Sequence, residues 1–291
     1  MATPSQWLAG ARPRTLPAAV SPVVAGSGAA YVAGQVSPLV AVLCLVVALA
    51  LQVGVNYAND YSDGIRGTDA VRVGPMRLVG SGAARPSSVK RAAFSSFGAA
   101  AAAGLAVVWL SGHWWLVVVG AAAILAAWFY TGGKRPYGYA GLGEVVVFVF
   151  FGLVAVMGTT YVQADRVTTV SFVTAVAVGL VACQVLVANN LRDITGDREV
   201  GKRTLATRLG DRGTRVLYLV MSIVVAVAVV VLAAVTTWWA LLALGGVLML
   251  GVATRSIVAG AAGRDLITVL ALTGMSELVM SFGLSIGWLI R

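Results

Sequence analysis

The chain of 291 residues carries a formal net charge of +10, yet only 11% of its residues are charged and 59% are hydrophobic. An ordinary soluble domain has about 25% charged residues, so a soluble protein is excluded, because it could not bury this much apolar surface. The apolar content also excludes intrinsic disorder, and two cysteines far apart in apolar segments exclude a disulfide-stabilised scaffold.

Long uncharged segments separate the charged residues. In chain order, segments of 45, 42, 20, 25 and 39 residues lack Asp, Glu, Lys and Arg, and the last 25 residues before Arg291 contain only Glu277. A helix needs about 20 apolar residues to cross a bilayer, so the longest segments predict helical hairpins and the others single spans. We expect an all-α integral membrane protein with nine transmembrane helices in one domain over 1–291.

The positive charges predict the orientation of these spans. Of the 21 Lys and Arg residues, only Arg166 and Arg291 fall outside the N-terminal segment and the connections after the even-numbered spans. Positive residues favour the cytoplasmic side. We therefore expect a plasma-membrane protein with a cytoplasmic N-terminus and an extracytoplasmic C-terminus. The net charge also favours contact with anionic lipid, and nucleic acid is not an expected partner.

Two cytoplasmic connections begin with the same polar pattern. The connection after the second span starts with Asn59 and Asp63, and the connection after the sixth span starts with Asn189 and Asp193. Each pair is four residues apart, and equivalent positions are 130 residues apart. This predicts two four-helix repeats in parallel orientation, followed by a ninth helix, around a cavity open to the cytoplasmic face.

The four-residue spacing suggests a metal site. Residues i and i+4 share one face of a helix, so Asn189, Asp193 and Asp197 are expected to form one stripe. Mg²⁺ prefers oxygen ligands and is usually bound by one or two carboxylates together with substrate phosphates. Two facing stripes would hold one diphosphate through Mg²⁺. The alternative, solvated carboxylates paired with nearby Arg, is less favoured because the pattern occurs twice near the membrane. The candidate metal ligands are Asn59, Asp60, Asp63, Asp69, Asn189, Asp193 and Asp197.

Cations flank both acidic patterns. Guanidinium groups bind phosphate oxygens through two parallel hydrogen bonds, and Lys supplies a point charge. Arg66 also flanks the first pattern, whereas six cations further along these connections are expected to serve membrane topology: Arg85, Lys90, Arg91, Arg208, Arg212 and Arg215. The candidates for diphosphate binding are Arg72, Arg77, Lys202 and Arg203.

With these motifs the sequence resembles the UbiA-type intramembrane aromatic prenyltransferases, which have nine helices and aspartate-rich motifs after helices 2 and 6. The second motif here matches that pattern at all three positions. The first matches at Asn59 and Asp63, but Gly67 occupies the third position and Asp69 follows two residues later. The stretches that are most similar to the menaquinone branch of the family are 12–17, 56–64, 77–82, 130–133 and 136–144.

The resemblance implies transfer of a polyprenyl group from its diphosphate to 1,4-dihydroxy-2-naphthoate, with Mg²⁺ as cofactor and loss of CO₂ and diphosphate. The product would be demethylmenaquinol. Another aromatic acceptor, such as 4-hydroxybenzoate or homogentisate, is an alternative. So is a secondary transporter, although its charges would be expected near the membrane midplane. The residues expected to act in catalysis are Asp63, Asp193, Asp197 and Lys202.

Further residues are expected to contact the substrates. Lys134 and Arg135 are candidates to hold the acceptor carboxylate, with membrane topology as the alternative role. Aromatic rings can stabilise an allylic cation, but an interfacial aromatic belt would use the same residue types. Glu144 is a candidate proton handler, with a favourable charge at a helix N-terminus as the alternative role. Glu277 is expected either to line the cavity or to pair with a polar neighbour. The remaining substrate-binding candidates are Arg14, Asn56, Tyr130 and Tyr139.

Overall fold

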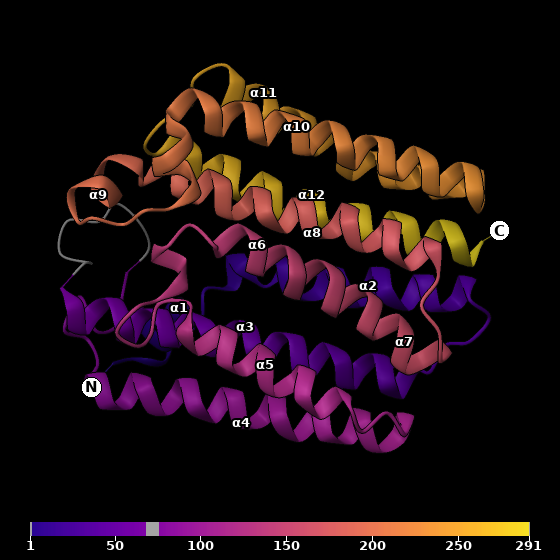
Figure 1. The fold of residues 1–291 in the computed structure, drawn as a ribbon, viewed down its shortest axis with the longest axis horizontal. Coiled ribbons are helices and arrows are strands. Elements are labelled where there is room, and N and C mark those ends of the chain that lie inside the picture. The colour runs from indigo at the N-terminus through magenta and orange to yellow at the C-terminus, as the bar shows by residue number, and fades with distance from the viewer. Residues whose placement is uncertain (1, 68–75, 291) are drawn as a thin grey trace.

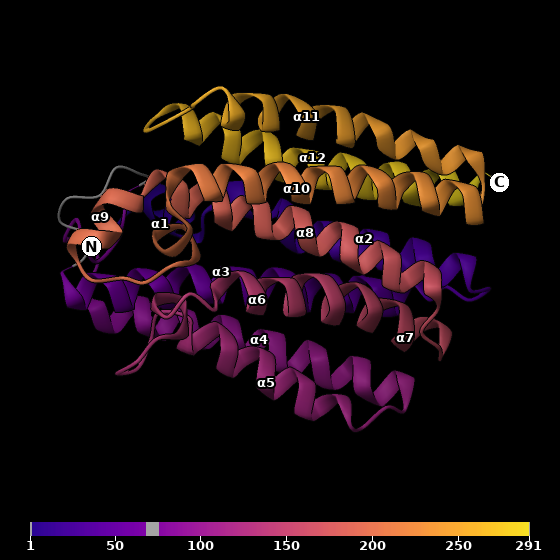
Figure 2. The same cartoon turned by 45° about the horizontal axis from the view of Figure 1, so that its top comes forward.

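A computed structural model describes residues 2–67 and 76–290, and this part of the chain contains helices and no strands. The long helices lie side by side along one axis, and the two ends of the chain lie at opposite ends of the bundle (Figures 1 and 2). An all-helical architecture is therefore confirmed. The aspartate-containing α9 (Ile194–Glu199) lies at the same end as the N-terminus.

Seven helical segments of the described chain are long and apolar enough to cross a membrane. They are α3 (Pro38–Arg66), α4 (Pro86–Ser111), α6–η3–α7 (Gly143–Ala164), α8 (Thr169–Arg192), α10 (Leu205–Val235), η4–α11 (Trp238–Val258) and α12 (Asp265–Leu289). α6 (Gly143–Val147), η3 (Phe148–Met157) and α7 (Gly158–Ala164) are consecutive parts of one segment, as are η4 (Trp238–Ala243) and α11 (Leu244–Val258).

Two further predicted spans have a different form in the structure. α1 (Pro4–Ala11) and η1 (Pro13–Thr15) join α2 (Pro17–Val32) at a bend of 48°, and this pair counts as one further span if it is a single broken helix. α5 (Leu116–Phe129) is apolar but has only 14 residues. By length and composition, the described residues thus give seven or eight spans rather than nine.

The chain itself encodes several helix ends. α3 begins with Pro38 at its first turn, where the missing N–H costs nothing, and the Ser37 hydroxyl accepts a hydrogen bond from the Val40 amide. The same helix ends at Gly67, whose φ of +72° lies in the left-handed region that favours glycine. This cap ends the helix one turn after Asp63 and so fixes where the first acidic motif meets the connection.

Small residues allow close packing in the second half of the bundle. Gly283 and Gly287 of α12 lie against η4, where an added Cβ would collide with Ala243 and with the Trp239 backbone. Such small-residue contacts replace the hydrophobic driving force that helices lack inside lipid. The Gly283-x3-Gly287 pattern therefore packs two segments of one chain together.

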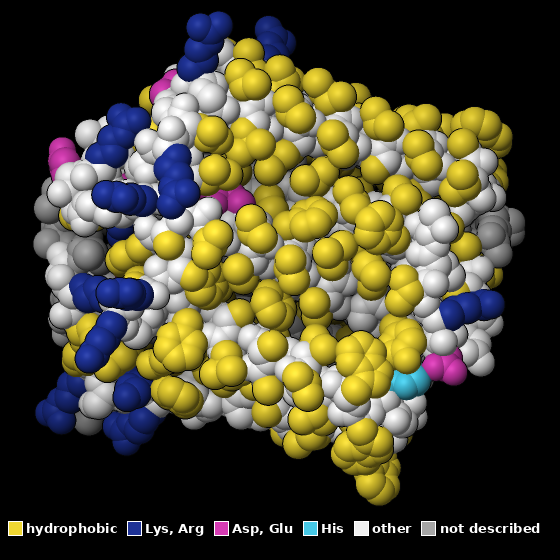
Figure 3. Space-filling view, in the orientation of Figure 1, with side chains coloured by type: hydrophobic (Ala, Val, Ile, Leu, Met, Phe, Trp, Pro, Cys, Tyr) yellow, Lys and Arg dark blue, Asp and Glu magenta, His cyan; other side chains and the backbone are white. Residues whose placement is uncertain are grey.

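The surface separates charge from apolar area along the bundle axis. Apolar side chains cover the middle of the visible face, and Lys and Arg gather mainly at one end (Figure 3). That end holds the N-terminus and α9 (Figure 1). Two pairs of tryptophans are exposed, one at the turn before α5 and one at the start of η4, as expected for anchors at a membrane interface. They are Trp114, Trp115, Trp238 and Trp239.

Candidate active site

The first acidic motif lies on the last turns of α3. Asn59 and Asp63 are 8% and 4% exposed, and the uninterrupted helix places them on one face, as predicted. Each of the two side chains is held from the connection between α5 and α6. Thr131 Oγ1 donates to Asn59 Oδ1 at 2.7 Å, and the Tyr139 hydroxyl donates to Asp63 Oδ1 at 2.7 Å.

The second acidic motif spans a break between two helices. α8 ends at Arg192, and Asp193 has φ −94° and ψ 5° before α9 begins. The expected single helical stripe is therefore corrected to two helices. The four-residue hydrogen bonds nevertheless continue across the break, from Asp193 N to Asn189 O at 3.2 Å and from Asp197 N to Asp193 O at 2.8 Å. Asp193 and Asp197 thus stay about one turn apart.

Arg192 organises the start of this motif, a role that its sequence position did not reveal. Its guanidinium donates to both carboxylate oxygens of Asp193 at 2.7 Å, and also to Asn189 Oδ1 at 2.8 Å. The neighbouring Asn190 is not part of this group and donates to Glu144 Oε1 at 2.9 Å. Arg192 therefore fixes the orientation of the Asp193 carboxylate before any ligand binds.

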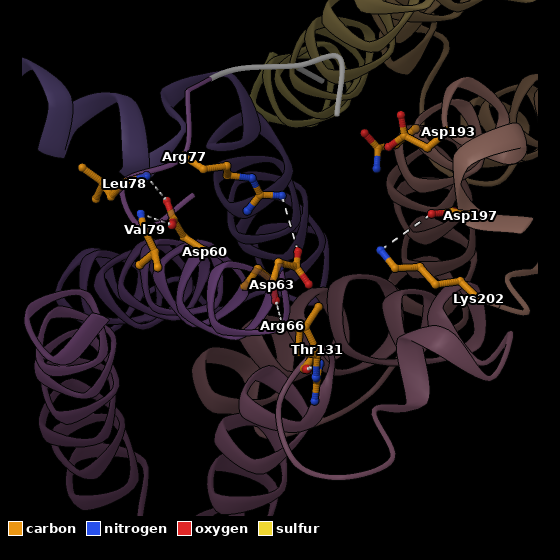
Figure 4. A network of polar contacts seen from close by, with 12 residues as sticks. Asp60, Asp63, Arg66, Arg77, Leu78, Val79, Thr131, Asp193, Asp197 and Lys202 are labelled. Carbon is orange, nitrogen blue, oxygen red and sulfur yellow. Dashed lines mark hydrogen bonds and ion pairs between the residues drawn. The ribbon is translucent and has the colours of Figure 1, made fainter. Parts of the chain in front are cut away.

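The two motifs face each other across the charged end of the bundle. Asp63 and Arg77 lie on one side, and Asp193, Asp197 and Lys202 on the other (Figure 4). Arg77 NH2 is 3.6 Å from Asp63 Oδ2, and Lys202 Nζ is 3.6 Å from Asp197 Oδ1. These separations exceed an ordinary hydrogen bond. Each side of the site therefore holds a carboxylate and a cation close together.

Asp60 has a different environment from its neighbour Asp63. It is 1% exposed, and its two carboxylate oxygens accept the backbone N–H groups of Leu78 at 2.7 Å and Val79 at 2.9 Å. Figure 4 shows the Asp60 side chain directed to this loop rather than toward the second motif. Asp60 therefore anchors the segment that carries Arg77, and the structure gives no support to its candidacy as a metal ligand.

The connection between α5 and α6 is a third part of the site. Arg66, at the end of α3, donates to the carbonyls of Thr131 and Gly133, so it anchors this loop. Lys134 and Arg135 are exposed on the loop surface. Asn59 and Thr131 are 72 residues apart in sequence, so no local pattern could have revealed their contact.

The remaining candidates lie around this centre. Arg14 and Arg203 are exposed, and Tyr130 packs edge-on against Tyr137, with their ring centroids 5.6 Å apart. The Tyr137 hydroxyl donates to Ala126 O at 2.8 Å, and burial raises the pKa of this phenol above its usual range. Asp69 and Arg72 lie outside the described residues.

An apolar cavity of about 560 Å³ extends from the first motif into the bundle between α2, α3, α4, α5 and the α6–η3–α7 segment. Along α3 its wall reaches from Asn59 to Cys44, which is roughly 22 Å at 1.5 Å per residue. Most of its lining is aliphatic or aromatic. The polar residues at the end near the motif include Gln52, Asn56 and Asn59.

Thr15 fixes the orientation of two amides in this wall. Its hydroxyl donates to Arg12 O at 2.9 Å and accepts from Gln52 Nε2 at 3.0 Å and from Asn56 Nδ2 at 2.9 Å. Asn56 Nδ2 also donates to Ala11 O at the end of α1, so this amide nitrogen ties both α1 and η1 to α3. Gln52 Oε1 is then buried without a hydrogen-bond partner among the described residues.

The donor set fits a divalent metal that is completed by its substrate. Among residues 2–67 and 76–290, no three His, Cys, Asp or Glu side chains stand close enough to form a metal cage by themselves. Mg²⁺ does not need such a cage, because it keeps several waters and binds substrate phosphates together with one or two carboxylates. Carboxylates on two facing sides, each with a nearby cation, suit a bound diphosphate, and the adjoining cavity suits an apolar chain.

Known proteins resemble this chain over most of its length. Residues 19–276 match the UbiA prenyltransferase family. A relative in Mycobacterium tuberculosis, named 1,4-dihydroxy-2-naphthoate octaprenyltransferase, is 53% identical over 288 residues, covering 98% of this chain and 97% of the relative. A relative of the same name in Escherichia coli is 41% identical over 230 residues, covering 76% and 75%.

Solved structures share the fold at low sequence identity. A UbiA homolog from Aeropyrum pernix K1 superposes with a TM-score of 0.71 at 15% identity, covering 92% of this chain and 97% of the other. A UbiA homolog from Archaeoglobus fulgidus bound to GPP and Mg²⁺ gives 0.62 at 15% identity, covering 96% and 98%. The chain belongs to the UbiA prenyltransferase family.

Proposed function

We propose that this protein transfers a polyprenyl group from polyprenyl diphosphate to 1,4-dihydroxy-2-naphthoate, with loss of diphosphate and CO₂, to give demethylmenaquinol. The observation that carries the proposal is the pair of facing carboxylate–cation motifs at the mouth of an apolar cavity. The choice of acceptor is supported by relatives from two bacteria that are named for this acceptor and match most of the chain.

We propose Mg²⁺ as the cofactor, held by Asn59, Asp63, Asp193 and Asp197, with Asn189 and Asp69 as further candidate ligands. The archaeal homologs bound to GPP or DMAPP together with Mg²⁺ support a divalent metal in this fold. When bound, the metal would act as a Lewis acid that neutralises the charge developing on the diphosphate as the allylic C–O bond breaks.

In this proposal the chain's own cations complete the diphosphate site. Arg77 would form paired hydrogen bonds with phosphate oxygens, and Lys202 would move from Asp197 to the diphosphate. Arg72 and Arg203 are further candidates in the same connections. Positive charge fixed in place before reaction stabilises a leaving group without reorganisation.

The cavity would hold the prenyl chain and exclude water from the allylic carbon. Its mainly aliphatic lining would keep water from an allylic cation, and Tyr130 at its polar end offers a ring face. Gln52 Oε1 needs a hydrogen-bond donor, and the hydroxyl groups of a dihydroxynaphthoate are donors, whereas a prenyl chain has none. Lys134, Arg135 and Arg14 remain candidates for the acceptor carboxylate.

We further propose that the chain is one transmembrane domain with nine spans, in which the bent α1–η1–α2 segment and the short α5 each count as one span. The concentration of Lys and Arg at the end that holds the N-terminus supports a cytoplasmic active site and a plasma-membrane location (Figure 3).

The most informative experiment is an acceptor panel with the purified protein, a long prenyl diphosphate, and Mg²⁺ or EDTA. We expect a demethylmenaquinol product by mass, release of CO₂ from carboxyl-labelled 1,4-dihydroxy-2-naphthoate, and no product in EDTA. Prenylation of 4-hydroxybenzoate or homogentisate in preference to the naphthoate would overturn the acceptor assignment. Absence of diphosphate release with every acceptor would overturn the enzymatic function.

A further inference from the structure

One residue of the connection between α5 and α6 contacts Asp63 of the first acidic motif and Lys202, the lysine that stands beside Asp197 of the second. Tyr139 ends the short helix η2 (Tyr137–Tyr139) and is partly buried. Its hydroxyl, its ring and its carbonyl each meet a different partner. We infer that Tyr139 is a positioning residue that couples the two motifs, by fixing the Asp63 carboxylate on one side and holding Lys202 on the other.

The contact with the first motif is a short hydrogen bond to a charged group. The Tyr139 hydroxyl donates to Asp63 Oδ1 at 2.7 Å, while Arg77 NH2 stands 3.6 Å from Asp63 Oδ2. The two oxygens of Asp63 thus have different neighbours, which sets the plane of the carboxylate. Hydrogen bonds of this kind to ligating carboxylates orient them and tune the affinity for the metal.

The contact with the second motif uses the ring and the backbone of the same residue. Lys202 Nζ lies 4.5 Å from the centroid of the Tyr139 ring and 3.6 Å from Asp197 Oδ1. The backbone N–H of Arg203, the residue after Lys202, donates to Tyr139 O at 3.0 Å. The ring and the carbonyl of Tyr139 therefore determine where the segment around Lys202 stands relative to Asp63.

The ring environment distinguishes this role from that of an aromatic wall for an allylic cation. Two cations of the chain already lie over the ring, Lys202 at 4.5 Å and the Arg66 guanidinium at 5.5 Å from the centroid. Tyr139 is absent from the lining of the apolar cavity, whereas Tyr130 and Tyr137 belong to it. Tyr139 therefore acts on the residues that bind the diphosphate rather than on the prenyl chain.

The positioning role of Tyr139 rests on the proposed metal function of Asp63. Three variants distinguish the effect of the Tyr139 hydroxyl from the effect of its ring. Tyr139→Phe removes the hydroxyl and keeps the ring over Lys202, and Tyr139→Leu removes both. Tyr137→Phe is the matched control in the same short helix, because its hydroxyl donates to Ala126 O at 2.8 Å and to neither motif. The partly buried position of Tyr139 accepts a phenylalanine without added volume, so these proteins are expected to fold, and their thermal midpoints in detergent check this.

The readout is Mn²⁺ binding measured by electron paramagnetic resonance in the presence of an unreactive geranyl thiolodiphosphate, together with kcat and KM for the prenyl diphosphate. Tyr139→Phe is expected to weaken Mn²⁺ binding by about 10- to 100-fold, as is usual when a partner of a ligating group is lost. Tyr139→Leu is expected to raise the donor KM as well. Tyr137→Phe is expected to leave Mn²⁺ affinity unchanged.

Asp63→Ala distinguishes failure of the inference from failure of the proposed function. If Asp63→Ala loses Mn²⁺ binding while Tyr139→Phe binds it like the unaltered protein, the positioning role is refuted and the function stands. If Asp63→Ala also binds Mn²⁺ normally, the metal assignment fails and the role of Tyr139 fails with it. An equal loss in Tyr137→Phe and Tyr139→Phe would show a general effect of the loop and would likewise refute the inference.

Discussion

Replacement of Asp60 by Asn tests whether this carboxylate anchors the Arg77 loop or binds metal. Asp60 is 1% exposed, and both of its oxygens accept backbone N–H groups, from Leu78 at 2.7 Å and Val79 at 2.9 Å. Asn has one oxygen, so its NH₂ group would face one of these N–H groups. A lost hydrogen bond to a charged group costs about 1.5–3 kcal/mol, so we expect the free energy of unfolding to fall by about 2 kcal/mol.

The same change is expected to act on the substrate through Arg77. If the loosened loop removes one charge-assisted contact of roughly 2 kcal/mol with the diphosphate, the donor KM rises about 30-fold. Because both changes act through one contact, Asp60→Asn combined with Arg77→Gln is expected to raise KM no further than Arg77→Gln alone. Steady-state kinetics and thermal unfolding in detergent measure both effects.

Asp211→Asn is the matched control for Asp60→Asn. The Asp211 side chain is 59% exposed and pairs with Arg215 one turn away, so its loss is expected to cost less than about 1 kcal/mol and to leave KM unchanged. Two results would refute the reasoning on Asp60. One is a loss of Mn²⁺ affinity in Asp60→Asn as large as in Asp63→Ala, and the other is full additivity with Arg77→Gln.

Three further predictions concern the metal, a buried acid and the cavity. Asp63→Ala and Asp193→Ala are each expected to abolish turnover with an unchanged elution profile in detergent; activity in both would remove the metal assignment. Glu277 is fully buried, and neither of its oxygens has a hydrogen-bond partner in the described chain. Because Glu277→Gln breaks no hydrogen bond, this variant is expected to keep its activity and its thermal midpoint, and an inactive variant would show a catalytic role. Gly104 lines the cavity and has only Val47 nearby, so Gly104→Phe is expected to slow turnover of long prenyl diphosphates more than of geranyl diphosphate. Gly98 is on the same helix, and no atom lies within 4 Å of a Cβ added there, so Gly98→Phe is expected to change the turnover of long and short prenyl diphosphates equally.

The sequence predicted the first motif well because only local geometry was needed. Asn59 and Asp63 are four residues apart on an uninterrupted helix, and they share a face as expected. For the second motif the same reasoning missed the end of α8 at Arg192, since nothing in the spacing marks the change of backbone conformation at Asp193. The hydrogen bonds that continue through the break preserved the predicted spacing of the two carboxylates.

Other features of the site depended on contacts that no local pattern contains. Asp60 and Asp63 are the same residue type three positions apart, yet one is directed to a backbone loop and the other faces the second motif (Figure 4). The Tyr139–Asp63 contact joins residues 76 positions apart. Uncharged segment lengths predicted membrane helices but not their boundaries, because turn residues carry no charge either, and α5 is therefore shorter than its segment suggested.

A structure of the protein in lipid nanodiscs with Mg²⁺ and an unreactive prenyl thiolodiphosphate would show whether the two acidic motifs hold one diphosphate between them. We predict that the diphosphate lies between Asp63 and Asp193, with metal ions shared by both sides, Lys202 and Arg77 on its oxygens, and the prenyl chain in the cavity. A diphosphate bound to one motif alone, or at a site remote from both, would show that the two motifs do not form one active site.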